Sequence, residues 1–272
     1  MARIMIAGLG KLGWPLAERL RDAGHQVTAL RRAAEAPAGV TLLAQDFSAD
    51  EVRLPSEQVD LLVWVLTPGR REEAAYQQAF IDWPQRVLDA LAKQQPLPPL
   101  VFVSSTAVYG EQSGEVSEQT PPRPEGVNGK ILWQAEQTLA ERTLFTAVRF
   151  SGIYNGQSQR ETDIALKLLA NPVLPNWKYS NRIHRADCVG ILAAVCEGWL
   201  EGEMQPPVVV GTDAYAAPNG EVYEFLAQRA GEFLQLPRPA IIDGKKVRSE
   251  FIEAGHYVLQ FPDFQKGFSS DV

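Results

Sequence analysis

The sequence predicts an α/β fold in which parallel strands form a doubly wound sheet, with a smaller lobe toward the C-terminus. Short apolar runs alternate with amphipathic segments along the first 150 residues, and three glycines separate the first apolar run from the first amphipathic segment. Such alternation is typical of βα units with parallel strands. With 272 residues and 45% hydrophobic content, the chain is long enough to bury a large core.

The expected elements of the sheet follow one another in a regular order. Strands are expected at 3–8, 26–31, 40–43, 61–66, 100–104 and 145–150. Helices are expected at 12–23, 70–93 and 130–142. Polar sequence rich in glycine and proline predicts a loop from Glu111 to Gly129.

A glycine motif follows the first strand. Gly8, Gly10 and Gly13 form the pattern GxGxxG between a short apolar strand and an amphipathic helix. The first glycine permits a tight turn, the second lets a pyrophosphate approach the backbone, and the third lets the helix pack closely on the sheet. The phosphates would lie at the helix N-terminus. We therefore expect a Rossmann-type dinucleotide site; the alternative is a glycine-rich turn in an ordinary βαβ unit.

The residues that end the second strand indicate which dinucleotide binds. An acidic side chain there bonds the ribose 2′-hydroxyl of NAD, whereas arginine accommodates the 2′-phosphate of NADP. This strand ends in Arg31 and Arg32 with no acid beside them, which favours NADP over NAD. The alternative is a solvated basic pair. Asp46 and Phe47, after the third strand, are expected near the adenine, and Thr67 lies at the carboxyl edge of the fourth strand.

Beyond Ser151 the alternation changes. A loop with several polar residues precedes a short helix at 160–170, and a helix at 186–200 and a strand at 207–211 are expected to rejoin the sheet. We therefore assign 1–150, with 181–212, to a dinucleotide-binding domain, and 151–180 with 213–272 to a small substrate lobe.

Charge and composition exclude several classes of function. A net charge of −7 and the absence of a long basic run argue against nucleic acid as the main partner. No apolar stretch approaches the roughly 20 residues that span a bilayer, so we expect no membrane partner and a cytoplasmic protein. Cys188 and Cys196 lack metal-ligand spacing and are expected to be small buried hydrophobes, with no metal site.

The order of these motifs resembles the extended short-chain dehydrogenase/reductase family, the NAD-dependent epimerase and dehydratase group. The matching segments are Gly8–Gly13, Asp46-Phe47, Val103–Gly110, Arg149–Tyr154 and Asn181–Asp187. The resemblance implies cofactor contacts at Gly8, Gly10, Lys11, Leu12, Gly13, Arg31, Arg32, Asp46, Phe47, Leu66, Thr67, Pro68, Phe150 and Ile153. It also implies that Ser105 bonds the reacting oxygen, although a strand-end capping hydroxyl is the alternative.

The tyrosine and lysine that do acid–base work in this family are spaced as YxxxK on one helix face. None of the seven tyrosines of this chain is followed four residues later by lysine. Alignment on Glu136 places Asn128 at the tyrosine position and Leu132 at the lysine position. A carboxamide cannot supply a proton at neutral pH, so the resemblance is to atypical members of the family, with Ser105 and Asn128 as the candidate catalytic residues.

Substrate contacts are expected from the residues around the cleft: Thr106, Tyr109, Tyr154, Arg182 and His184. Each has a structural alternative; for His184 it is a hydrogen-bonded histidine that fixes a strand-to-helix turn.

Two functions therefore remain open. The first is an NADP-dependent oxidoreductase or isomerase acting on a small polar or nucleotide-sugar-like substrate. The second is a non-catalytic protein that binds NADP(H) or senses redox state. The helices at 70–93 and 130–142 correspond to the pair through which the resembling family commonly forms homodimers.

Overall fold

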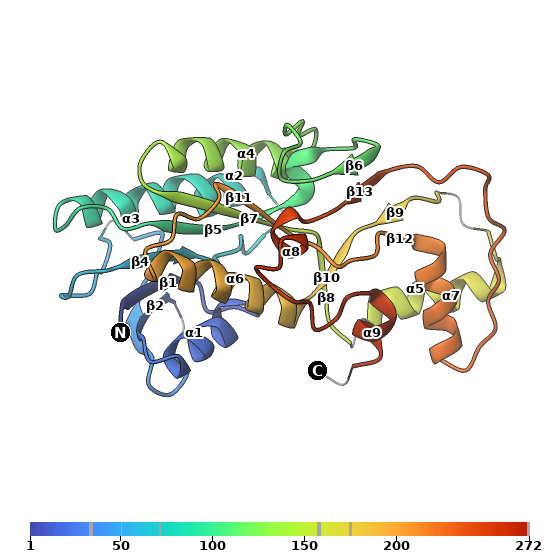
Figure 1. The fold of residues 1–272 in the computed structure, drawn as a ribbon, viewed down its shortest axis with the longest axis horizontal. Coiled ribbons are helices and arrows are strands. Elements are labelled where there is room, and N and C mark those ends of the chain that lie inside the picture. Colours follow the sequence, from blue (N-terminus) through green and yellow to red (C-terminus); the bar gives the residue numbers. More distant parts are fainter. Residues whose placement is uncertain (33–34, 50, 71, 157–158, 174–175, 271–272) are drawn as a thin grey trace. The chain divides into compact units, whose positions relative to one another are not determined.

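The computed structural model describes residues 1–32, 35–49, 51–70, 72–156, 159–173 and 176–270 (Figure 1). The chain divides into two compact units. The first comprises Met1–Gly110, Pro122–Arg149 and Val189–Val209, and the second comprises Glu111–Pro121, Phe150–Cys188 and Val210–Val272.

A seven-stranded sheet with the order β11-β7-β5-β4-β1-β2-β3 dominates the first unit. Its strands are β1 (Arg3–Ala7), β2 (Gln26–Arg31), β3 (Thr41–Ala44), β4 (Leu61–Trp64), β5 (Leu100–Ser105), β7 (Phe145–Phe150) and β11 (Val208–Gly211). β1 pairs in parallel with both β2 and β4, and β2–β3 and β4–β5 are parallel as well. The predicted doubly wound α/β fold is therefore confirmed, and the strand order reverses between β1 and β4.

Helices flank both faces of this sheet. α2 (Glu73–Gln77), α3 (Trp83–Ala92) and α4 (Val127–Ala140) lie on one side in Figure 1, and α1 (Gly13–Asp22) and α6 (Arg185–Leu200) lie on the other. α1 forms because Leu16, Ala17 and Leu20 recur at helical spacing and bury one face completely. Among the described residues, no helix is long and apolar enough to cross a membrane.

Two expected elements differ in detail. The helix expected at 70–93 begins at Glu73 and contains a π-helical turn at Gln78–Asp82, while residue 71 lies outside the described residues. The buried Trp64 indole donates a hydrogen bond to the Ala79 carbonyl, at 2.9 Å, which satisfies one backbone acceptor of the irregular turn. The expected loop at 111–129 contains β6 (Gly114–Val116) and the first residues of α4.

The second unit combines short strand pairs with helices. β8 (Gly152–Tyr154) pairs with β10 (Arg182–His184), β9 (Tyr179–Ser180) with β12 (Ala217–Pro218), and β6 with β13 (Lys245–Val247). Its helices are α5 (Gln159–Ala170), α7 (Asn219–Arg229), α8 (Glu250–Glu253) and α9 (Phe264–Phe268). Tyr154, Ala165, Leu226 and Phe268 are among the buried residues that form its core.

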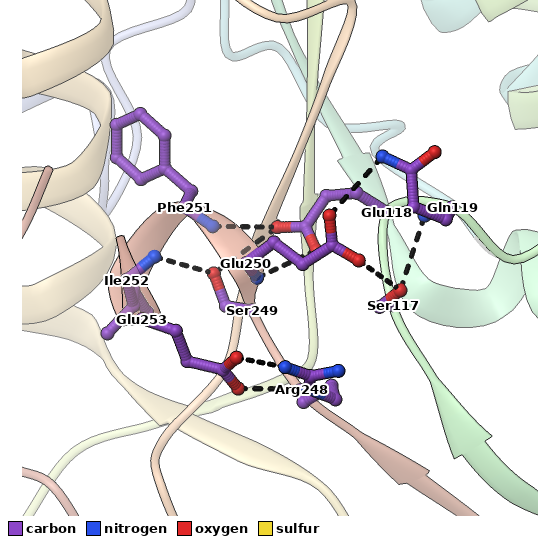
Figure 2. Close-up of polar contacts among 9 residues, drawn as sticks. All are labelled: Ser117, Glu118, Gln119, Arg248, Ser249, Glu250, Phe251, Ile252 and Glu253. Carbon is purple, nitrogen blue, oxygen red and sulfur yellow. Dashed lines mark hydrogen bonds and ion pairs between the residues drawn. The ribbon is translucent and has the colours of Figure 1, made fainter. Parts of the chain in front are cut away.

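Glu118 connects its own segment with Val210 and with the start of α8, and Figure 2 shows its contacts with the start of α8. One carboxylate oxygen accepts hydrogen bonds from the Val210 amide at 3.0 Å and the Ser249 hydroxyl at 3.3 Å, and the other accepts from the Glu250 amide at 2.9 Å. Ser249 in turn caps α8 by accepting from the Ile252 amide. A carboxylate at a helix N-terminus accepts hydrogen bonds from the free amides there and interacts favourably with the positive end of the helix dipole. Glu118 therefore holds Glu111–Pro121 on this unit.

Candidate functional site

A pocket of about 840 Å³ lies in the first unit, at the carboxyl ends of four parallel strands. Its lining consists of Gly8–Gly10 after β1, Arg31 and Arg32 at the end of β2, Asp46–Ser48 after β3, Val65–Thr67 after β4, and Gly69, Gln78, Trp83 and Leu30. Open α/β sheets bind ligands outside the carboxyl ends of their strands, where the strand order reverses. β1 and β4 form that reversal here, so the pocket lies where the fold predicts a ligand.

The three glycines of the motif have different surroundings. Gly8 has a φ of +104°, and a methyl group on it would lie 2.9 Å from the backbone of Leu66. A methyl group on Gly13 would lie 1.9 Å from the Gly8 carbonyl oxygen, whereas one on Gly10 would meet no atom within 4 Å. Gly8 and Gly13 therefore permit the close turn, and Gly10 leaves open space beside the backbone.

The N-terminus of α1 faces this turn without a side-chain cap, because Leu12 occupies the N-cap position and makes no capping hydrogen bond. Uncapped amides and the positive end of the helix dipole together favour a phosphate. The open space at Gly10 and the free helix N-terminus fit a dinucleotide pyrophosphate.

The base-binding side of the pocket carries aromatic and charged groups. The Arg31 guanidinium lies 5.7 Å from the centre of the Trp14 ring. The Phe47 ring is stacked 5.5 Å from Trp83. Hydrogen bonds from the amide and hydroxyl of Ser48 hold the pKa of Asp46 below its usual value, so its carboxylate is ionised and can accept a hydrogen bond from an adenine amine or a ribose hydroxyl.

Most of the predicted cofactor residues lie in or beside this pocket. Gly8, Gly10, Arg31, Arg32, Asp46, Phe47, Leu66 and Thr67 line it. Lys11 and Pro68 adjoin lining residues in the chain, and Leu12 and Gly13 follow two and three residues after Gly10; none of these four lines the pocket itself. Phe150 and Ile153 belong to the second unit, where Phe150 is buried and Ile153 is 46% exposed. Sequence analysis missed Trp83 and Gln78, because a helix that covers the pocket has no motif to mark it.

The candidate catalytic residues lie at the end of β5 and the start of α4. The Ser105 hydroxyl accepts a hydrogen bond from the Ala107 amide at 3.2 Å and so caps the 3₁₀ turn Thr106–Tyr109. α4 packs closely on that turn, since a methyl group on Gly129 would lie 2.6 Å from the Ala107 carbonyl oxygen. Asn128 is exposed in the first turn of α4, and Leu132 is buried one turn later. Neither can act as an acid.

Tyr109 belongs to a buried charged network in the first unit. Its hydroxyl accepts a hydrogen bond from Arg149 at 2.9 Å, and Arg149 forms a 2.6 Å ion pair with Glu136, which also accepts from Ser104. Burial works to lower the pKa of Arg149, but hydrogen bonds and charge from Glu136 outweigh it and hold that pKa above its usual value. Tyr109 is fully buried, and this position gives it a structural role.

The remaining predicted substrate residues lie in the second unit, apart from Thr106, which is buried in the 3₁₀ turn. The Tyr154 hydroxyl donates to the Asp263 carbonyl at 3.2 Å, and burial raises the pKa of Tyr154 far above its usual value. His184 accepts a hydrogen bond from the Ala186 amide and packs 3.9 Å from the Phe261 ring. Those contacts fix the strand-to-helix turn. Arg182 is considered below.

The comparisons with known proteins agree with this geometry. The model of the NAD dependent epimerase/dehydratase family matches residues 4–129. The solved structure of a candidate NAD-dependent epimerase/dehydratase from Methylobacillus flagellatus is 31% identical, with a TM-score of 0.81 over 98% of this chain and 96% of that one. The chain belongs to the NAD-dependent epimerase/dehydratase family.

Other relatives of this epimerase/dehydratase family member are more distant. Protein YeeZ of Escherichia coli K12 is 24% identical over 97% of both chains. The UDP-glucuronic acid 4-epimerase of Bacillus cereus, solved in complex with NAD, is 15% identical, with a TM-score of 0.76 over 98% of this chain and 96% of that one. At this identity the likeness to the Bacillus enzyme concerns the fold alone.

Proposed function

We propose that this chain binds NADP(H) in the pocket at the carboxyl ends of β1 to β4. The observation that carries the proposal is the placement of Arg31 and Arg32 at the pocket wall, at the end of β2, where the lining residues Leu30, Arg31 and Arg32 include no acid; Asp46, the acid of the lining, follows β3. Two guanidinium groups would attract a 2′-phosphate, and an acid at that point would repel it. The Bacillus enzyme was solved in complex with NAD, which makes NAD the competing cofactor.

The chain's own residues would hold the dinucleotide at three places. The backbone at Gly10 and the N-terminus of α1 would receive the pyrophosphate, Arg31 and Arg32 the 2′-phosphate, and Asp46 and Phe47 the adenine. The nicotinamide ring of the bound dinucleotide supplies hydride transfer.

For activity, we propose an NADP-dependent oxidoreductase or isomerase that acts on a small polar or nucleotide-sugar-like substrate. Family membership supports this proposal, and so does Ser105, which lies at the end of β5 with its hydroxyl able to donate to a substrate carbonyl. The acid must then come from outside the positions of Asn128 and Leu132.

A second candidate function is NADP(H) binding without catalysis. The specific observation in its favour is the pair of residues in the first two turns of α4: Asn128 cannot donate a proton at neutral pH, and Leu132 is 3% exposed and apolar. Such a protein would bind the dinucleotide and show no turnover.

Fluorescence titration of the purified protein with NADPH and NADH tests the cofactor. We expect NADPH to bind more tightly, and Arg31→Ala with Arg32→Ala to weaken NADPH binding about tenfold or more while changing NADH binding by less than about twofold. Arg19→Ala, an exposed arginine of α1, is the control and should change neither. An equal loss for both dinucleotides would contradict the assignment of the arginines to the 2′-phosphate.

The two candidate functions are separated by incubating the protein with NADP or NADPH and a panel of carbonyl compounds and nucleotide sugars. Absorbance change at the reduced nicotinamide band, or formation of an epimer detected by chromatography, supports catalysis. Binding without either change supports the second function.

A further inference from the structure

The second unit contains a buried carboxyl group that its own protein environment leaves without a partner. Asp213 is 3% exposed, and neither oxygen of its side chain has a hydrogen-bond partner among the described residues. A buried polar group without a partner destabilises the folded state, so native proteins supply one from protein, water or ligand. The Tyr215 amide lies nearby, outside the geometry of a full hydrogen bond.

An arginine lies next to this carboxyl group without pairing with it. The Asp213 amide donates to the Arg182 carbonyl at 2.7 Å, which holds the two residues side by side. Among the described residues, only one guanidinium nitrogen of Arg182 makes hydrogen bonds. It donates to the carbonyl oxygen and to the hydroxyl of Ser180. No ion pair joins Arg182 to Asp213 in this part of the chain, although their charges influence each other.

Arg182 and Asp213 do not form the bidentate pair that a guanidinium and a carboxylate can make. Two guanidinium nitrogens of Arg182 and both oxygens of Asp213 instead remain available. A molecule that offers an anionic group to the arginine and a hydroxyl to the carboxyl group would satisfy both sides at once. Such a molecule is an anion with an adjacent hydroxyl.

We propose that Arg182 and Asp213 form a binding site for a hydroxy acid, whose carboxylate accepts hydrogen bonds from Arg182 and whose hydroxyl bonds Asp213. Tyr154 forms part of its surroundings. All of these residues belong to the second unit, whereas the residues of the dinucleotide pocket belong to the first. Binding of the hydroxy acid can therefore be measured without dinucleotide. That the hydroxy acid is the substrate rests on the oxidoreductase or isomerase activity proposed above.

The protonation of Asp213 explains why an anion is tolerated beside it. Burial, partly offset by the charge of Arg182, raises the pKa of Asp213 to about 8. The other charged or titratable groups that act on Asp213 or on Arg182 come from several elements: Tyr154 on β8, Glu161 on α5, Asp187 on α6, Tyr223 on α7 and Asp263 before α9. Asp213 is therefore neutral at pH 7 and does not repel a carboxylate, and it becomes repulsive as the pH rises through its pKa.

The test is a saturation-transfer NMR titration of the full chain without dinucleotide. The probes are glycolate and D-glucuronate, which separate a small hydroxy acid from a sugar acid, and ethylene glycol and D-glucose are their neutral counterparts. We expect one or both anions to bind at pH 6.5, about tenfold more weakly at pH 9.5, and the neutral counterparts to bind at least tenfold more weakly than the anions.

Three variants assign the site. Arg182→Gln should abolish anion binding. If circular dichroism shows that this variant is unfolded, Arg182→Lys takes its place and should weaken anion binding, because lysine keeps the charge and lacks the bidentate donors of arginine. The Asp213→Asn variant should bind the anions at pH 6.5 and should bind them as tightly at pH 9.5. Arg160→Gln, an exposed arginine on α5, is the charge control and should bind like the wild type.

The proposal is overturned if neither anion binds the wild type, which would mean an internal water only, or if Arg182→Gln binds as well as Arg160→Gln. It is also overturned if Asp213→Asn keeps the pH dependence. NADPH titration of the same samples measures dinucleotide binding by the first unit. If the dinucleotide proposal fails, NADPH will not bind, whereas anion binding by the second unit can still be observed.

Discussion

At the scale of single residues, chemistry in this chain depends on what surrounds each side chain. Gly10 and Gly13 belong to one motif, yet one borders open space and the other touches a backbone carbonyl. Ser104 and Ser105 are neighbours in β5, yet Ser104 bonds the buried Glu136 at 2.5 Å and Ser105 caps a turn. Residue type fixes what a group can do, and its neighbours fix what it does.

Alanine at the two glycines should separate binding from stability. Gly13→Ala brings a methyl group to 1.9 Å from the Gly8 carbonyl oxygen, so we expect a loss of about 1–3 kcal/mol in the free energy of unfolding. Gly10→Ala should leave stability within about 0.5 kcal/mol and weaken dinucleotide binding about tenfold, because its methyl group would occupy space meant for the pyrophosphate. Urea unfolding and NADPH titration measure both; a Gly10→Ala protein that binds normally would contradict the assignment.

The raised pKa of Asp213 also predicts a pH dependence of stability. In the unfolded chain this carboxyl has its ordinary pKa of 3.8, and in the folded chain its pKa is about 8. Between about pH 4 and pH 8 the folded state holds a proton that the unfolded state has released, so the contribution of Asp213 to stability falls as pH rises through that window. Above about pH 8 it falls no further.

Urea unfolding of wild type and Asp213→Asn checks this sign. We expect the unfolding free energy of the variant to rise relative to that of the wild type by up to about 4 kcal/mol as pH rises from 5 to 8.5, because the wild type must bury a charge over about three pH units of that window. Asp163→Asn, at an exposed position of α5, is the control: its unfolding free energy should differ from that of the wild type by the same amount at every pH. A constant difference for Asp213→Asn would mean that its pKa is not raised.

At the scale of elements, short pieces of structure are held by side chains from distant sequence. α8 has four residues and cannot form alone, since short helices are marginal in water. Its amides are satisfied by Glu118, which lies more than 130 residues earlier in the chain (Figure 2). The π turn at Gln78–Asp82 likewise has a tertiary partner in the Trp64 indole.

Glu118→Gln should therefore loosen α8. All of the groups that Glu118 bonds are donors, and glutamine would direct an NH₂ group at some of them, which removes acceptors and adds a clash of donors. We expect a loss of about 1–3 kcal/mol in unfolding free energy and faster amide exchange at Glu250 and Phe251. Glu115→Gln, exposed in β6, is the control; equal effects of both variants would contradict the role of Glu118.

At the scale of the whole molecule, α2, the π turn, α3 and α4 pack together on one face of the sheet (Figure 1). We propose that this helical face forms a homodimer, as the resemblance to the short-chain dehydrogenases implies. Gln134 and Gln137 are exposed on α4, so they are available to a partner.

Light scattering after size exclusion tests the dimer. We expect a mass of twice the 30.0 kDa of one chain and a shift toward the monomer in the double variant Gln134→Arg and Gln137→Arg, because four added charges at a two-fold contact repel. Gln265→Arg, exposed on α9, should leave the mass unchanged. A monomeric wild type would exclude the proposal.

The sequence by itself determined the sheet and the cofactor turn of this protein. Apolar periodicity located the strands from Arg3–Ala7 to Phe145–Phe150 within one or two residues, and the glycine spacing located the turn between β1 and α1. Both signals are local, because strand burial and helix packing act on consecutive residues and leave their period in the sequence.

Only the tertiary structure decided the rest. Trp83 reaches the pocket from a helix, β6 pairs with a strand 131 residues later, and Glu118 caps α8 across a similar distance. Asp213 carries no sequence signal at all; its carboxyl lacks a partner, and burial raises its pKa although the charge of Arg182 partly offsets that effect. These properties depend on which residues the fold brings together and what water it excludes, and a linear pattern holds no record of either.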